Sequence, residues 1–414
     1  MATGLALAEE SAAAILASAA ADGERLRALW SGLRATGGLT VARLLQRALA
    51  GGAGSDAAAV AASDSCWEKL HTGDWKDVAH AWRDAYSLAA LRSFVSAPQD
   101  AHGDAAVVAD RAAASLRALD VAALVGGPAF RPEVDRAIEV AQHALEAAQP
   151  RASKRQRCAG LGGAGAEPRT LLGEPPPGGL APLPPGSGVG GVPRAEMPPL
   201  EEFLTRHMLA DGGVGAPLVL TGLLASWPAL QRWRDPAYLA AAAGARTVPV
   251  EVGEHYLSPS WRQELMPLAR FLDAHVASCG APPDASARGY LAQHALFEQV
   301  PTLRADIRTP DYCSLGGGEL HAVNAWLGPA GTVTPLHHDP HHNLLAQAVG
   351  IKYVRLYAPA AGGPGALYPH ASGHCTNSSR VDVCAPDHEA FPRFAGAPYT
   401  DVELHAGEVR GCVR

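Results

Sequence analysis

The residue types most able to hold a metal ion are concentrated in residues 332–343, Thr-Val-Thr-Pro-Leu-His-His-Asp-Pro-His-His-Asn. His337 and Asp339 are two residues apart on an expected strand, where alternate side chains face the same way, so an imidazole and a carboxylate converge. Two histidines and one carboxylate on one face, with open positions opposite, form the Fe(II) site of non-haem oxygenases. An H-x-D triplet alone is a weak signal. Three further histidines are expected at the surface: His338, His341 and His342.

The neighbours of this pair strengthen the prediction. Asn343 follows Asp339 by four residues and shares its strand parity. Lys352 lies across an expected hairpin that turns at Gly350, and it is one of only four lysines among the 34 lysine and arginine residues. Oxygenases that use 2-oxoglutarate need a cation for its distal carboxylate, and a compact lysine ammonium is not interchangeable with an arginine fork. The alternative for Lys352 is an ordinary exposed strand residue.

The elements that would position these residues are short strands that begin near residue 197. Many short strands separated by turn residues predict an antiparallel sandwich or barrel. The expected strands are 217–222, 248–252, 290–294, 322–327, 343–349 and 352–357, and helices are expected near 200–208 and 267–277.

The N-terminal region, residues 1–149, has apolar residues at helical spacing and predicts an all-α domain. Trp67, Trp75 and Trp82 are expected to pack in its core, with Trp75 and Trp82 on one helical face. Residues 150–196 are rich in proline and glycine and predict a disordered linker. The fold class is therefore α+β: a helical domain, a linker, and a β-rich domain over 197–414.

Composition excludes several function classes. The net charge of −7 over 414 residues argues against a general nucleic-acid binder, and no apolar run is long enough to span a membrane. Seven scattered cysteines without a C-x-x-C pair indicate reduced thiols in the cytosol or nucleus. The basic cluster at 154–157 is compatible with nuclear import or with a solvated charge run. The Gly-x-Gly-x-x-Gly match at 160–165 is rejected as a dinucleotide site, because no strand precedes it.

Residues 197–409 resemble the JmjC-domain 2-oxoglutarate oxygenases. Within that family the resemblance is strongest to members with a helical N-terminal domain, and it extends to residues 67–75 of this chain. The matching strings are Arg246-Thr-Val-Pro-Val-Glu-Val-Gly253, Gly289-Tyr-Leu-Ala-Gln-His294, Pro310-Asp-Tyr-Cys-Ser-Leu-Gly316, Asn324-Ala-Trp326, Pro335-Leu-His-His-Asp-Pro340, Lys352-Tyr-Val-Arg-Leu-Tyr357 and Ala366-Leu-Tyr-Pro-His370.

The resemblance implies a double-stranded β-helix, the cupin or JmjC jelly roll, that uses Fe(II), 2-oxoglutarate and O2. It implies that His337 and Asp339 are catalytic iron ligands, and that the cofactor-binding residues are Tyr290, Thr334, Asn343 and Lys352. The residues that match a pocket for a substrate arginine are Glu251, Trp261, Gln293 and Trp326. A carboxylate and aromatic faces suit a guanidinium group. The alternatives are core packing for the two tryptophans and a solvent-facing position for Glu251.

The chain departs from the family pattern after Gly407-Glu408-Val409. The family carries its third ligand, a histidine, shortly after that turn, whereas this chain continues Arg410-Gly-Cys-Val-Arg414. We therefore expect a jelly roll that lacks its last strands and holds Fe(II) weakly, either as an incomplete gene model or splice form or as a truncated protein. Three other histidines are poor substitutes for the third ligand: His294, His321 and His405.

The leading interpretation is hydroxylation of an arginine side chain in a protein substrate, such as an arginine-containing peptide or a histone tail. The alternatives are demethylation of histone methyl-lysine, which uses the same chemistry, and an inactive protein-binding form. A peptidase activity attributed to the family finds no support in a nucleophile elbow or H-E-x-x-H motif. We expect nuclear or cytoplasmic residence, with neither a nucleic acid nor a membrane as direct partner.

Overall fold

The computed structural model describes residues 2–96, 105–148, 172, 188–276, 285–317 and 319–412. The chain divides into two compact units, residues 1–160 with 245–247, and residues 161–244 with 248–414. No helix in the described ranges is both long and apolar enough to cross a membrane.

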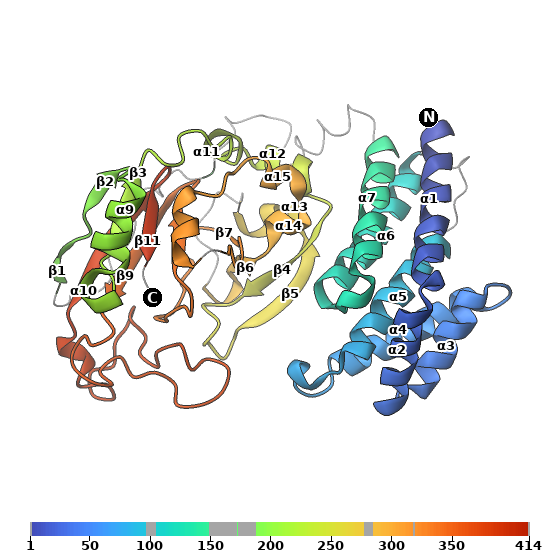
Figure 1. Cartoon of the computed structure of the whole chain (residues 1–414), viewed down its shortest axis with the longest axis horizontal. Coiled ribbons are helices and arrows are strands. Elements are labelled where there is room, and N and C mark those ends of the chain that lie inside the picture. Colours follow the sequence, from blue (N-terminus) through green and yellow to red (C-terminus); the bar gives the residue numbers. More distant parts are fainter. Residues whose placement is uncertain are drawn as a thin grey trace. The chain divides into compact units, whose positions relative to one another are not determined.

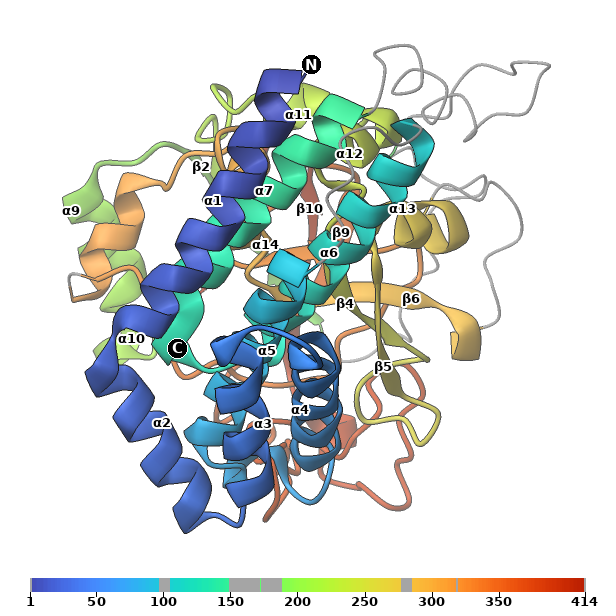
Figure 2. The same cartoon turned by 90° about the vertical axis from the view of Figure 1, so that its right-hand side faces the viewer.

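The first unit is helical, as the sequence predicted (Figure 1). Its helices are α1 (Ala2–Ala21), α2 (Gly23–Ala35), α3 (Leu39–Ala50), α4 (Ser55–Leu70), α5 (His80–Ser96), α6 (Ala105–Val125) and α7 (Arg131–Ala148), with short turns η1 (Trp75–Asp77) and η2 (Pro128–Phe130). Figure 2 shows α1, α7 and α6 side by side. Helix α5 contacts all the other helices, and residues 85–91 are buried without interruption. A helix that is buried on every side forms the centre of a bundle.

The prediction that three tryptophans pack in this core holds only for Trp82. Trp82 is 7% exposed and its indole nitrogen donates to Thr36 at 2.9 Å, whereas Trp75 is 61% exposed. Gly73 has a left-handed φ of 85°, and the Asp74 side chain accepts from the backbone of Lys76 and starts η1. Trp75 therefore belongs to a separate turn, and the expectation that it shares a helical face with Trp82 is wrong. Trp67 is also partly exposed, at 38%.

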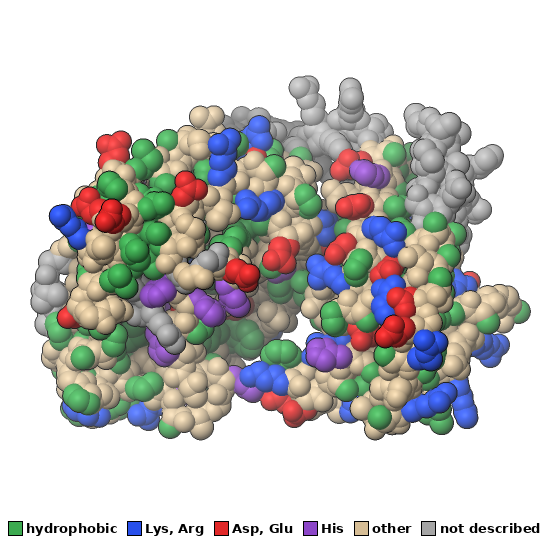
Figure 3. Space-filling view, in the orientation of Figure 1, with side chains coloured by type: hydrophobic (Ala, Val, Ile, Leu, Met, Phe, Trp, Pro, Cys, Tyr) green, Lys and Arg blue, Asp and Glu red, His purple; other side chains and the backbone are tan. Residues whose placement is uncertain are grey.

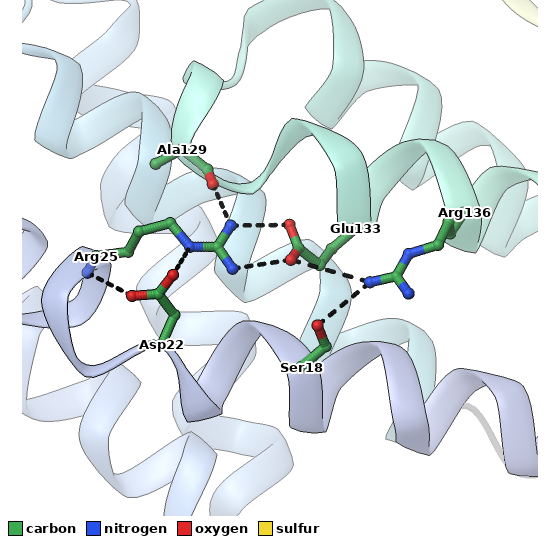
Figure 4. A network of polar contacts seen from close by, with 6 residues as sticks. All are labelled: Ser18, Asp22, Arg25, Ala129, Glu133 and Arg136. Atoms are coloured by element: carbon green, nitrogen blue, oxygen red, sulfur yellow. Dashed lines mark hydrogen bonds and ion pairs between the residues drawn. The ribbon is translucent and has the colours of Figure 1, made fainter.

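An ionic network ties three helices of this unit together (Figure 4). Asp22 caps α2 by accepting from the backbone nitrogen of Arg25 at 2.9 Å. The Arg25 guanidinium then donates to both carboxylate oxygens of Glu133 on α7, at 3.1 and 2.9 Å. Arg136, on the same helix, donates to Ser18 of α1 at 3.4 Å. Burial disfavours ionisation of Glu133, but the Arg25 hydrogen bonds outweigh it and hold its pKa below the usual range.

The second unit combines three sheets with short helices, which confirms the α+β class and the cupin-like antiparallel sheets. The strands are β1 (Gly188–Gly191), β2 (Arg194–Glu196), β3 (Leu218–Thr221), β4 (Thr247–Val252), β5 (Arg262–Pro267), β6 (Gly289–His294), β7 (Ala325–Leu327), β8 (Asn343–Ala346), β9 (Ile351–Tyr357), β10 (Tyr399–His405) and β11 (Val409–Cys412). The sheet orders are β1-β10-β9, β2-β3-β11-β8 and β5-β4-β6-β7. The short helices of this unit are α9 (Leu200–Phe203), α10 (Ala210–Gly213), α11 (Ala229–Arg232), α12 (Pro236–Ala243), α13 (Leu268–Phe271), α14 (Leu296–Gln299) and α15 (Pro301–Arg304).

The expected hairpin at Gly350 is wrong. Gly350 does turn the chain, with a φ of 77°, but β8 pairs with β11 while β9 pairs with β10. Gln347 is held by the turn between β10 and β11, because its backbone nitrogen donates to Glu408 and its carbonyl accepts from Gly407. The chain therefore crosses from one sheet to the next instead of folding back on itself.

The expected linker is shorter than predicted at its C-terminal end. Residues 188–191 and 194–196 form β1 and β2, which pair in parallel with β10 and β3. The cluster at 154–157 and the glycine-rich match at 160–165 lie outside the described residues.

Candidate metal and substrate site

The segment that carries His337 is extended but is not a regular strand, contrary to the prediction. His337 forms a single antiparallel bridge with Ser378. On either side of it, Leu336 accepts from the backbone nitrogen of Ser379 at 2.8 Å, and His338 donates to the carbonyl of Asn377 at 2.9 Å. Prolines 335 and 340 flank the segment, and proline interrupts a strand ladder because it has no N–H to donate. Residues 377–379 therefore position His337.

His337 and Asp339 converge as their spacing predicted. His337 Nε2 lies 3.7 Å from Asp339 Oδ1. His337 Nδ1 donates to the carbonyl of Pro335 at 2.8 Å, which places the proton on Nδ1 and leaves Nε2 available to a metal ion. Asn343 Nδ2 donates to Asp339 Oδ2 at 2.7 Å and orients the carboxylate. The chemistry and the spacing of the two donors fit two of the three ligand positions of an Fe(II) facial triad.

Within the described ranges, no group of three or more His, Cys, Asp and Glu side chains could hold a metal ion. The histidines weighed as a third ligand have other neighbours. His294 Nε2 lies 2.7 Å from Gln299 Oε1, the His321 ring packs 4.2 Å from that of His341, and His405 lies 3.7 Å from Glu403. Figure 3 shows histidine side chains gathered on one face of the second unit.

Two of the expected 2-oxoglutarate residues come together from different sheets. Lys352 on β9 donates through Nζ to Tyr290 Oη on β6 at 3.1 Å. Its ammonium also lies 5.7 Å from the centre of the Tyr290 ring. Thr334 is exposed, and among the described residues no hydrogen bond joins it to either of them. The structure thus pairs Lys352 with Tyr290, and Thr334 takes no part in that hydrogen bond.

A small pocket brings Glu251 and Trp261 together with Tyr290. Glu251 lies opposite Tyr290 in the β4–β6 register, and all three residues line the pocket. Burial raises the pKa of the Glu251 carboxyl, and a hydrogen bond from the Trp261 side chain opposes that rise. Trp261 is 37% exposed, so the alternative that it packs in the core is wrong. A partly buried carboxylate beside an exposed indole is suited to a cationic side chain.

Gln293 and Trp326 lie on the neighbouring strand pair. The β6–β7 register shifts between Leu291 and His294, and Gln293 within this irregularity has a φ of 49°. Leu327 pairs with Leu291 and Ala325 with His294, so Trp326 lies opposite the irregular stretch. Trp326 is 42% exposed, which again contradicts core packing. Neither residue lines the small pocket.

Sequence reasoning missed two residues near this site. Arg288 lines the small pocket, donates to the carbonyl of Gly331, and keeps a buried Nε for which the described residues provide no partner. Tyr256 lies between Glu251 and Trp261 in sequence and contacts Ser378. Arg288 immediately precedes the Gly289-Tyr290 motif, and that position was the one available signal.

Comparison with known proteins finds relatives of both parts of the chain. The family described as "Cupin-like domain" matches residues 202–409, and the family "KDM8-like, N-terminal ARM repeats" matches residues 19–156. "Lysine-specific demethylase JMJ30" of Arabidopsis thaliana is 39% identical, over 92% of this chain and 86% of its own. "Lysine-specific demethylase 8" of Danio rerio is 36% identical, over 84% and 79%. The human "Bifunctional peptidase and (3S)-lysyl hydroxylase JMJD7" is 26% identical, over 53% and 76%.

These matches cover both units of the chain, and the family they define uses Fe(II) and 2-oxoglutarate with O2. The chain therefore belongs to the JmjC-domain Fe(II)- and 2-oxoglutarate-dependent oxygenases, in the branch with KDM8-like N-terminal ARM repeats.

Proposed function

We propose that this protein oxidises a cationic side chain of a protein substrate, and that demethylation of a methylated lysine is its leading reaction. The observation that carries the reaction class is the convergence of His337 and Asp339, with Asn343 bonded to the carboxylate. Two relatives named as lysine-specific demethylases, each aligned with more than four-fifths of this chain, support the choice of reaction.

The chain's own residues have distinct tasks in this proposal. His337 and Asp339 would hold Fe(II), which when bound supplies the oxidative decarboxylation of 2-oxoglutarate to succinate and the insertion of one oxygen atom of O2 into a C–H bond. Lys352 and Tyr290 bind the distal carboxylate of 2-oxoglutarate through an ammonium and a phenol hydroxyl. Hydroxylation of an N-methyl group yields a carbinolamine, which releases formaldehyde and leaves the amine one methyl group shorter.

Arginine hydroxylation is the second candidate, and the Glu251–Trp261 pair favours it. A carboxylate accepts charge-assisted hydrogen bonds from a guanidinium fork, and an indole face stacks on its plane. A methylated ammonium has fewer N–H donors to offer Glu251, or none when it carries three methyl groups. The same pocket therefore suits either cation, with a preference in hydrogen bonding for arginine.

Mass spectrometry of reacted peptides separates the two candidates. Paired peptides that differ only in trimethyl-lysine or arginine at one position are incubated with Fe(II), 2-oxoglutarate and O2. Demethylation removes one methylene mass from the lysine peptide, whereas hydroxylation adds one oxygen mass to the arginine peptide. Product on the arginine peptide alone would replace the leading reaction with the second candidate.

The matched control is His337→Ala, which removes a metal ligand from an extended segment whose backbone hydrogen bonds remain possible. Succinate that forms with wild type and fails with this variant would tie turnover to the site. Peptide binding without succinate formation by wild type would contradict the proposal and favour a protein-binding role.

Nuclear or cytoplasmic residence is part of the same proposal, and imaging of the tagged full chain tests it.

A further inference from the structure

A tyrosine outside the small pocket reaches the segment that carries the metal ligand. Tyr256 lies in residues 253–261, which join β4 to β5, and its Oη is 2.8 Å from Ser378 Oγ. Ser378 is only 2% exposed, and Tyr256 is partly buried. A hydrogen bond between two hydroxyls at this depth has little competition from water, so it fixes their relative position.

Ser378 is the residue whose backbone bridges His337. Its carbonyl accepts from His370 at 3.0 Å, and its nitrogen donates to Cys375 at 2.8 Å, so the backbone on the far side of the bridge is also anchored. The Tyr256 hydroxyl therefore acts on a residue that is already held by the backbone and directly opposes His337. A displacement of Ser378 would therefore move His337 directly, because the two residues are paired in the bridge.

The same tyrosine belongs to the loop that forms the cation pocket. Trp261 donates its backbone nitrogen to Ser258 at 3.0 Å, and Ser258 donates to His255 at 2.9 Å. A Cβ at Gly253 would lie 3.1 Å from the Cα of Trp261, so the two ends of the loop are in close contact. Backbone hydrogen bonds thus link Trp261 through Ser258 to His255, the residue next to Tyr256.

Charge provides a second link between the two sites. Burial raises the pKa of the Tyr256 hydroxyl, the Ser378 hydrogen bond opposes this, and the charges of Cys375, Glu251 and Asp339 raise it further. The hydroxyl is thus within electrostatic reach of Glu251 on the pocket side and of Asp339 on the metal side.

We propose that Tyr256 is a positioning residue that couples occupancy of the Glu251–Trp261 pocket by a cationic side chain to placement of His337 for metal binding. A cation beside the partly buried Glu251 holds the 253–261 loop closed and keeps Tyr256 on Ser378. By linkage, metal and cation then strengthen each other's binding by the same factor. The inference rests on the proposed function, because it uses that site's pocket and ligands.

The test measures Mn(II) affinity of the full chain by electron paramagnetic resonance, with saturating 2-oxoglutarate and no turnover. Each titration is repeated with millimolar Nα-acetyl-arginine amide or Nα-acetyl-trimethyl-lysine amide as the pocket probe. We expect a probe to tighten wild-type Mn(II) binding about fivefold or more, the lower end of common allosteric couplings. Tyr256→Phe and Ser378→Ala should each reduce that effect to less than about twofold, and the double variant should show no further loss, because both remove one hydrogen bond.

Ser379→Ala is the matched control. Ser379 Oγ donates to Leu367 at 2.6 Å and accepts from the backbone of Val381, so its loss loosens the same segment without touching Tyr256. The control should keep the dependence on the probe. If it abolishes that dependence as fully as Tyr256→Phe does, the effect is general loosening and the inference is overturned.

Failure of the inference and failure of the proposed function give different results. Saturable Mn(II) binding by wild type that no probe alters would overturn the coupling and leave the metal site in place. Probe-dependent binding that persists in Tyr256→Phe would likewise overturn it. An absence of saturable Mn(II) binding by wild type would overturn the proposed function and this inference together.

Discussion

Lys352 Nζ donates a hydrogen bond to Tyr290 Oη across 3.1 Å, although the two residues are 62 positions apart and lie on strands of different sheets. The pair joins a strand of the β1-β10-β9 sheet to one of the β5-β4-β6-β7 sheet. An ammonium and a phenol hydroxyl at one point are suited to a carboxylate, and the proposed 2-oxoglutarate site draws one of them from each sheet.

Replacing Lys352 should therefore weaken 2-oxoglutarate binding. Lys352→Met removes a charge-assisted hydrogen bond worth about 1.5–3 kcal/mol, so the Kd for 2-oxoglutarate should rise about 10- to 150-fold. Tyr290→Phe keeps the ring against the ammonium and should cost less than about tenfold. Isothermal titration of the Mn(II)-loaded protein measures both values. An unchanged Kd in Lys352→Met would remove this residue from the 2-oxoglutarate site.

Glu251 should make peptide binding depend on pH. Burial raises the pKa of its carboxyl, so it takes up a proton at a higher pH than a glutamate in water. Affinity for a cationic peptide should therefore fall as the pH drops through that raised pKa. Glu251→Gln should bind about tenfold more weakly at neutral pH and lose the dependence, because a neutral amide makes no charge-assisted hydrogen bond.

Fluorescence anisotropy of a labelled arginine or methyl-lysine peptide, recorded without metal, measures this dependence. Glu254→Gln is the control, because Glu254 lies in the same loop and lines the same pocket but is exposed. Its pH profile should match that of wild type. A Glu251→Gln profile that still follows wild type would show that another group governs the effect.

Local sequence patterns predicted where the strands lie better than which strands pair with each other. Val248 to Val252 alternate in burial as a strand should, and the segment is β4. A strand, a glycine turn and a second strand give the same sequence pattern in a hairpin and in a chain that crosses from one sheet to another. Which of the two forms at Gly350 depends on β10 and β11, which lie about 50 residues further along and pair with β9 and β8.

The same limit applies to the site. The spacing of His337 and Asp339 was enough to place their donors together, because two residues on extended chain share a face. The bridge from Ser378 to His337 has no sequence signal, since serine and asparagine show no periodicity and the register depends on the path of the intervening chain. Trp75 was misplaced for a related reason, because the spacing of seven residues assumed one continuous helix, whereas η1 ends at Asp77 and α5 begins at His80.

The two adjacent histidines 337 and 338 should differ sharply in metal binding. His337 points Nε2 toward Asp339, whereas the hydrogen bonds of His338 within the described ranges join its backbone to Asn377. His337→Ala should weaken Mn(II) binding about tenfold or more. Loss of a residue that only hydrogen-bonds a metal ligand already weakens binding by about that factor, and loss of the ligand itself should cost at least as much. His338→Ala should stay within about twofold of wild type. The reverse order would show that His338 is the ligand.

Glu133 should be a carboxylate on which the helical unit depends for stability. Its side chain is 5% exposed and receives both Arg25 hydrogen bonds, so Glu133→Ala leaves a partly buried guanidinium without its main partner. The free energy of unfolding should fall by about 2–3 kcal/mol. Asp135→Ala is the control, because the exposed Arg131–Asp135 pair should contribute less than about 0.5 kcal/mol.

The Glu133 effect should also depend on pH. Because Arg25 holds the folded-state pKa of Glu133 below its usual range, the stabilisation is fully present above the unfolded-state pKa and is lost as the pH falls through the folded-state value. Urea unfolding of wild type and Glu133→Ala, followed by circular dichroism from neutral to acid pH, measures this directly. The two unfolding curves should converge at the acid end, and a difference that persists there would show that packing, and not the ion pair, accounts for the loss.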